Sequence, residues 1–69
     1  MSDSLQHFGA VLRKRRIEKG FSLRKFADLV EISPTYLSLV ETGKAEYAPA
    51  VERVRRMAEL LGADPDQWI

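Results

Sequence analysis

The sequence predicts an all-α fold, a compact bundle of five short helices whose second and third members form a helix-turn-helix. The main indication is residues 23–42, LRKFADLVEISPTYLSLVET, where apolar residues recur at the spacing of two amphipathic helices that can share one core. A second indication is the pair Ser22 and Ser33, which stand where the N-caps of these helices belong. Pro34 follows the second serine at the first helical position, where a residue without an N–H group is tolerated.

Length and composition limit the chain to one small domain. Its 69 residues, 45% of them hydrophobic, allow a single modest core. The absence of cysteine excludes a disulfide framework and a thiolate site, and no apolar run approaches the roughly 18 residues that span a bilayer. Residues 1–4 are polar, unlike a signal sequence. The expected location is therefore the cytoplasm, with no membrane partner.

Positive charge is concentrated in the first part of the chain. The net charge is only +1, but residues 1–30 contain seven Lys or Arg against three Asp or Glu. Residues 31–69 reverse the balance, with four basic and seven acidic residues. The first two helices are therefore the expected location of a basic surface, which attracts nucleic acid. Arg13, Lys14 and Arg15 spread around the exposed sides of the first helix, where solvation is the simplest interpretation of Lys14 and Arg15.

The pattern around this motif extends over most of the chain. From about Phe8 to Trp68 the sequence resembles the lambda-repressor-like (Xre-type) helix-turn-helix family. The matching positions are Leu12, Arg16, Gly20, Ser22, Ala27, Ser33, Glu41, Gly43, Val54, Ala58, Leu61 and Gly62. The resemblance implies a domain of a transcriptional regulator, expected to be a repressor, that binds double-stranded DNA with residues 34–42 in the major groove. Two positions depart from the family pattern: Leu23 replaces a usual Gln, and Glu31 stands where Gly is common.

The first helix is expected over residues 4–19, and Gly20 suits a left-handed position at its end. One face of this helix is apolar and carries Leu5, Phe8 and Leu12. Arg16 falls on the same face, where it needs a partner because a buried arginine is rarely unpaired. Glu41 borders the apolar face of the third helix and is the candidate partner, and the family resemblance implies a similar pair.

The start of the second helix carries two cations, Arg24 and Lys25, in a first turn where the helix dipole favours anions. A DNA phosphate on the backbone N–H groups of this turn would relieve the conflict, with Arg24 or Lys25 beside it. The alternative is that both side chains extend into water, at a cost of only about 0.3 to 1 kcal/mol. The Leu23 side chain offers no polar contact of the kind that Gln could make. The predicted phosphate contacts are Ser22, Leu23, Arg24, Lys25, Thr42 and Lys44.

The third helix, expected over residues 34–42, directs Leu37 and Val40 toward the core and a mainly polar face outward. The N-terminal residues of such a helix meet base edges in this motif. The predicted base contacts are Pro34, Thr35, Ser38 and Leu39. Hydroxyl groups can bond to bases or phosphates and aliphatic carbons can pack on thymine methyl groups, but no Arg, Asn or Gln here offers a bidentate contact. Tyr36 is expected to pack rather than to read bases.

A fourth helix is expected over residues 50–61 and ends at Gly62. Its expected core residues are Val51, Val54, Met57, Ala58 and Leu61. Asp64 then caps a fifth helix that returns Trp68 and Ile69 to the bundle. An ending one turn into a helix predicts the N-terminal part of a longer regulator. We expect this piece to be mainly a monomer at micromolar concentration and to bind DNA usefully as a homodimer, with any dimer contacts near its C-terminal residues.

Catalytic functions are not indicated. The sequence has one histidine, His7, and no cysteine, glycine-rich phosphate loop or cluster of acids, so it offers no nucleophile–base pair or metal site. We expect His7 on the surface, no enzyme activity, no cofactor and no small-molecule ligand. The alternative to DNA binding is a protein-interaction module of the same fold, such as an antitoxin or partner-binding regulator, that uses Leu23, Leu39 and Tyr47. Ionic strength separates the two, because salt weakens DNA binding steeply and a hydrophobic interface far less.

Overall fold

The computed structural model describes residues 2–68, and this part of the chain is entirely helical apart from its connections. The five helices are α1 (Ser2–Glu18), α2 (Leu23–Val30), α3 (Pro34–Glu41), α4 (Val51–Leu61) and α5 (Pro65–Trp68). The predicted all-α class, helix order and helix-turn-helix are therefore confirmed. The boundaries agree to within two residues, with α1 starting earlier than predicted and α4 starting one residue later.

The two serines cap α2 and α3 as predicted. The Ser22 hydroxyl oxygen accepts a hydrogen bond from the Lys25 N–H at 3.0 Å, and that of Ser33 accepts one from the Tyr36 N–H at 3.0 Å. Between the helices, Glu31 adopts a left-handed conformation with φ 65° and ψ 42°. A residue with a Cβ atom is strained there by roughly 1 to 2 kcal/mol, so the turn forms at a cost that glycine would avoid.

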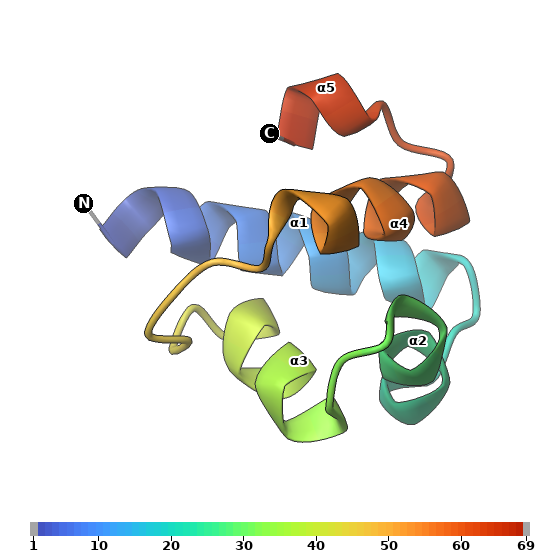
Figure 1. Cartoon of the computed structure of the whole chain (residues 1–69), viewed down its shortest axis with the longest axis horizontal. Coiled ribbons are helices and arrows are strands. Elements are labelled where there is room, and N and C mark those ends of the chain that lie inside the picture. Colours follow the sequence, from blue (N-terminus) through green and yellow to red (C-terminus); the bar gives the residue numbers. More distant parts are fainter. Residues whose placement is uncertain (1, 69) are drawn as a thin grey trace.

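Figure 1 shows the arrangement of these elements: α1 and α4 run across the middle of the molecule, α2 and α3 lie below them, and α5 lies above. The main helix contacts are those of α1 with α3, α2 with α3 and α4, and α4 with α5. The buried core draws on α1, α2, α3, the following loop and α4, and its described residues are Leu12, Phe26, Ala27, Val30, Leu37, Val40, Ala45, Val54, Met57, Ala58 and Leu61. Trp68 of α5 packs its ring edge-on against Phe8, with 5.4 Å between the ring centroids. None of the helices in residues 2–68 is both long and apolar enough to cross a bilayer.

α1 and α3 approach each other closely at Gly9. A Cβ atom on Gly9 would overlap the carbonyl oxygen of Val40 and lie 2.9 Å from that of Glu41. Both obstacles are backbone atoms of α3, which cannot move aside as a flexible side chain could. The hydrogen atom of glycine therefore sets the distance between these two helices.

One core residue was predicted wrongly. Val51 shares the apolar stripe of α4, yet its side chain is 49% exposed. A position on the correct face is not sufficient for burial, because another element must also cover that turn, and Val51 stands in the first turn of α4. The remaining four core residues predicted for this helix are buried. The expected packing of Leu5 and Ile69 lies outside what the structure describes, because neither the side chains of residues 2–6 and 65 nor residues 1 and 69 are described.

Candidate nucleic-acid interface

The orientation of α3 is held by an ion pair with α1. The Arg16 guanidinium donates from Nε to Glu41 Oε2 at 2.7 Å and from Nη2 to Glu41 Oε1 at 3.1 Å. Its Nη1 donates to the backbone oxygen of Phe21 at 2.8 Å. Both charged residues are buried, with 8% and 7% of their surfaces exposed. The structure thus contains the expected ion pair. Arg16 also bonds to the segment that connects α1 to α2, through the Phe21 carbonyl.

At the start of α2, the serine cap leaves two backbone donors available. Ser22 accepts the Lys25 N–H, and Phe26 N–H donates to the Ser22 carbonyl at 3.0 Å. The N–H groups of Leu23 and Arg24 occupy the first turn, where a helix provides no internal acceptor. An anion such as a phosphate can accept from donors of this kind and is favoured further by the helix dipole.

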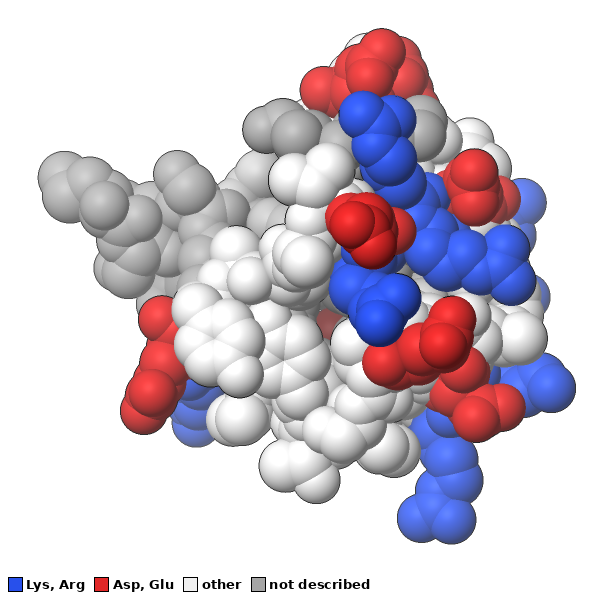
Figure 2. Space-filling model, in the orientation of Figure 1, with Lys and Arg blue, Asp and Glu red and all other residues white. Residues whose placement is uncertain are grey.

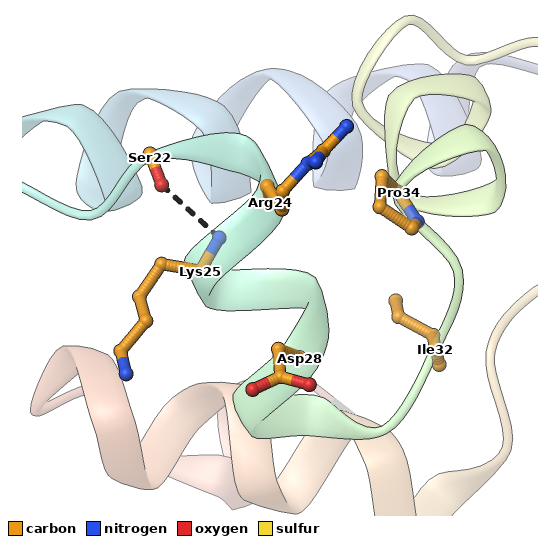
Figure 3. Close-up of a pocket in the computed structure, with 6 residues that line it drawn as sticks. All are labelled: Ser22, Arg24, Lys25, Asp28, Ile32 and Pro34. Carbon is orange, nitrogen blue, oxygen red and sulfur yellow. Dashed lines mark hydrogen bonds between the residues drawn. The ribbon is translucent and has the colours of Figure 1, made fainter.

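Figure 3 shows that the two cations of this turn point in different directions. Both line an open groove together with Ile32 and Pro34, but Arg24 extends toward α3 whereas Lys25 extends away from it. A phosphate beside α3 would therefore meet Arg24 before Lys25. The sequence alone predicted either Arg24 or Lys25 beside the phosphate, because it does not specify where α3 lies relative to them.

An acidic side chain, Asp28, lines the same groove. Its carboxylate lowers the positive potential near Arg24 and opposes an incoming phosphate. Sequence reasoning missed this residue. The signal that could have found it is the spacing, because Asp28 follows Arg24 by four positions and residues at that spacing share one side of a helix.

The outer face of α3 carries no charged side chains. Leu37 and Val40 are fully buried beneath it. The predicted base-contact residues are all exposed, and they are Pro34, Thr35, Ser38 and Leu39. Leu39 is 39% exposed, which is common for a single surface leucine, so its predicted role in contacts comes from its place beside Thr35 on this face. In the view of Figure 2, the surface over α3 is largely uncharged, whereas Lys, Arg, Asp and Glu gather over α4 and α2.

The two remaining predicted phosphate contacts lie after α3. The Thr42 hydroxyl donates back to the Ser38 carbonyl at 2.9 Å and lies 3.3 Å from the Leu39 carbonyl. A phosphate offers only acceptors, so this hydroxyl must leave its carbonyl before it can donate to DNA. Lys44 is exposed on the following loop, and its own N–H donates to the Leu39 carbonyl at 2.8 Å.

A second shallow pocket brings three helices together. Its lining comes from α1, the start of α2 and the outer side of α3, and consists of Arg13, Arg16, Leu23, Ser38, Glu41 and Thr42. Three predicted DNA contacts, Leu23, Ser38 and Thr42, therefore lie close together although they come from two helices. Arg13 joins them from α1 and was not among the predicted contacts.

The loop after α3 is held against the helix by a pair of tyrosines. The rings of Tyr36 and Tyr47 stack with 5.6 Å between their centroids, and the Tyr36 hydroxyl donates to the Tyr47 carbonyl at 3.0 Å. Burial raises the pKa of the Tyr36 hydroxyl above its usual value, and the neighbouring Tyr47 raises that pKa further. The interpretation of Tyr36 as a packing residue is confirmed.

Comparison with known proteins identifies this arrangement. Residues 7–68 match a protein family described as "Helix-turn-helix domain". The chain belongs to this family. The helix-turn-helix domain is 33% identical over 61 residues to the "Uncharacterized HTH-type transcriptional regulator YddM" of Escherichia coli (strain K12). The match covers 88% of this chain and 63% of that regulator, so the chain spans less than two thirds of its relative's length.

Two solved structures have the same fold as this helix-turn-helix domain. The clp gene regulator ClgR from Corynebacterium glutamicum is 34% identical, with a TM-score of 0.79 over 94% of this chain and 67% of that one. The restriction-modification controller protein C.AhdI from Aeromonas hydrophila is 26% identical, with a TM-score of 0.81 over 99% and 96% of the two chains. The predicted Xre-type helix-turn-helix is confirmed, and the relatives that this chain matches are regulatory proteins.

Proposed function

We propose that this domain binds double-stranded DNA sequence-specifically by placing α3 in the major groove, and that it represses transcription by occupying a short operator. The observation that carries the proposal is the two-sided character of α3. Leu37 and Val40 anchor the helix in the core, while Thr35, Ser38 and Leu39 stand exposed on a face without charge. A helix held in this way can present its outer side chains to base edges at a constant orientation.

The chemistry of this face favours contacts of modest strength. The hydroxyl groups of Thr35 and Ser38 can donate to or accept from base edges, and Leu39 together with the Thr35 methyl group can pack on thymine methyl groups. Pro34 adds apolar surface at the N-terminal end. Because α3 has no Arg, Asn or Gln, it cannot form the bidentate contacts that discriminate most strongly between bases.

Affinity for DNA that does not depend on its sequence comes from phosphate contacts around the start of α2. The N–H groups of Leu23 and Arg24 and the Arg24 guanidinium hold one phosphate beside Ser22. Lys25 contributes less because it extends away from α3. Lys44 and, after release of its internal hydrogen bond, Thr42 contact the backbone beyond the other end of α3.

Binding measurements on selected duplexes test this division of roles. We expect Leu39→Ala to change which duplex is preferred, because it removes an apolar contact to bases. We expect Arg24→Gln to weaken binding to all duplexes alike and to lower the slope of log K against log salt by about one unit. Lys25→Gln is the matched control, with the same change in charge one residue along and a smaller effect. Equal effects of Arg24→Gln and Lys25→Gln, or an unchanged preference for Leu39→Ala, would contradict the proposed orientation.

In the alternative function, binding of a partner protein, the apolar surface available is smaller than the sequence indicated. Leu39 and Tyr47 are exposed, but Leu23 is partly buried and packs against the core. Binding that resists increasing salt, with loss of binding in a Tyr47→Ala variant, would favour a protein partner over DNA.

We further propose that the domain is the DNA-binding part of a longer regulator that acts as a homodimer on two half-sites about 34 Å apart. The greater length of YddM supports the first point. The Trp68 ring packs against Phe8 and is only partly exposed, so less of this side chain is available for a dimer contact. Sedimentation equilibrium of the 69-residue chain should therefore find mainly monomer at micromolar concentration. A stable dimer of this chain would contradict the expectation.

A further inference from the structure

Arg13 stands on α1 beside the surface assigned to DNA, although the proposed function gives it no role. It lines the shallow pocket that also contains Leu23, Ser38 and Thr42. We propose that Arg13 contacts a DNA phosphate, so that the DNA backbone crosses the junction of three helices rather than following α2 and α3 alone. This inference rests on the proposed function and adds a contact from a helix outside the helix-turn-helix motif.

The face of α1 that carries Arg13 is set by helix geometry. Gly9, Arg13 and Arg16 are spaced at i, i+4 and i+7, so they lie on one side of α1. Gly9 meets the backbone of α3, and Arg16 pairs with Glu41 of α3. Arg13 therefore lies on the side of α1 that packs on α3 but is itself exposed, which places its guanidinium at the rim of the α1–α3 contact.

Charge pairing leaves Arg13 as the cation of this pocket that is available for DNA. Each nitrogen of the Arg16 guanidinium already donates to Glu41 or to the Phe21 carbonyl, and the Glu41 carboxylate is neutralised in return. Thr42 uses its hydroxyl proton within α3, and the Leu23 side chain has no donor. A guanidinium can donate two parallel hydrogen bonds to phosphate oxygens and remains charged at any pH of interest.

The two cations that follow Arg13 on α1, Lys14 and Arg15, do not line the pocket that contains Leu23, Ser38 and Thr42. Arg15 lines a different pocket with Phe8 and Trp68, between α1 and α5. Lys14 lines a pocket with Ile17 and Glu18 that Arg13 also lines, but of these two cations only Arg13 reaches the pocket beside α2 and α3 as well. Arg15 is therefore a matched control for Arg13, on the same helix and with the same charge but directed away from α3.

The experiment compares Arg13→Gln with Arg15→Gln in the whole chain, over a series of salt concentrations and with both preferred and unrelated duplexes. At about 0.1 M salt we expect Arg13→Gln to weaken binding to every duplex about fivefold to tenfold and to reduce the salt slope by about one unit. Arg15→Gln should change the affinity less than about twofold. Arg13→Lys keeps the charge and should recover most of the slope. Equal behaviour of the Arg13→Gln and Arg15→Gln variants overturns the inference.

Failure of the inference and failure of the proposed function give different results. If the wild-type chain binds no duplex, or if Arg24→Gln and Leu39→Ala leave binding unchanged, both the proposed function and the role of Arg13 are contradicted. If those variants respond as expected while Arg13→Gln behaves like Arg15→Gln, only the role of Arg13 falls. Should Arg13→Gln impair folding, the NMR signal of the wild-type Arg13 Nε–H decides: it should shift on addition of DNA, and an unchanged signal overturns the inference.

Discussion

Replacing Glu41 with alanine should lower the free energy of unfolding by about 3 to 5 kcal/mol. The substitution leaves the Arg16 guanidinium buried, with its bonds of 2.7 and 3.1 Å to the carboxylate lost and only the Phe21 carbonyl still accepting from it. An uncompensated buried charge is costly because water cannot reach it. A domain of this size has a total stability of only about 3 to 10 kcal/mol, so the loss is a large part of the whole. Urea denaturation followed by circular dichroism measures it directly.

The control for this prediction removes both charges together. In a double variant, Arg16→Met with Glu41→Leu, no charge remains to be solvated, and the loss of stability should be much smaller than for Glu41→Ala alone. A loss below about 1 kcal/mol for Glu41→Ala would contradict the role assigned to the pair. So would a double variant that is less stable than the single one.

Replacing Gly9 with alanine should destabilise the domain by about 2 to 3 kcal/mol, although the local effect has the opposite sign. In the middle of a helix, alanine is favoured over glycine by about 1 kcal/mol. Here the new Cβ atom would overlap the Val40 carbonyl oxygen and crowd that of Glu41 at 2.9 Å. Neither atom can move without shifting α3, and such a shift also strains the Arg16 ion pair. The steric cost therefore exceeds the gain in helix propensity.

Ala10 offers the matched control in the same turn of α1. Its side chain is exposed, so Ala10→Gly should cost only the difference in helix propensity, about 1 kcal/mol. Thermal and urea unfolding of the two variants compare the effects on one scale. Increased stability of Gly9→Ala, by the amount that propensity alone predicts, would show that α1 and α3 can separate without cost and would overturn this interpretation.

The sequence by itself determined the helices and their order. Ser22 and Ser33 could be recognised as caps because a cap bonds to a backbone group only three residues away. The exposed and buried sides of α3 followed in the same way from its period. The partnership of Arg16 and Glu41 was also predictable, since a cation on an apolar face requires an opposite charge. These inferences rest on interactions within a helix turn, or on a rule that admits few partners.

Only the tertiary structure decided which faces meet and how closely. Nothing in the local sequence distinguishes Gly9 from a glycine tolerated on the surface, because its importance comes from the α3 backbone that lies against it. The exposure of Val51, the different directions of Arg24 and Lys25, and the place of Arg13 beside α3 have the same origin. Each depends on the packing of helices that are distant in the sequence. Helical periodicity specifies the side of a helix on which a residue lies, but the packing of the neighbouring helices specifies what that side touches.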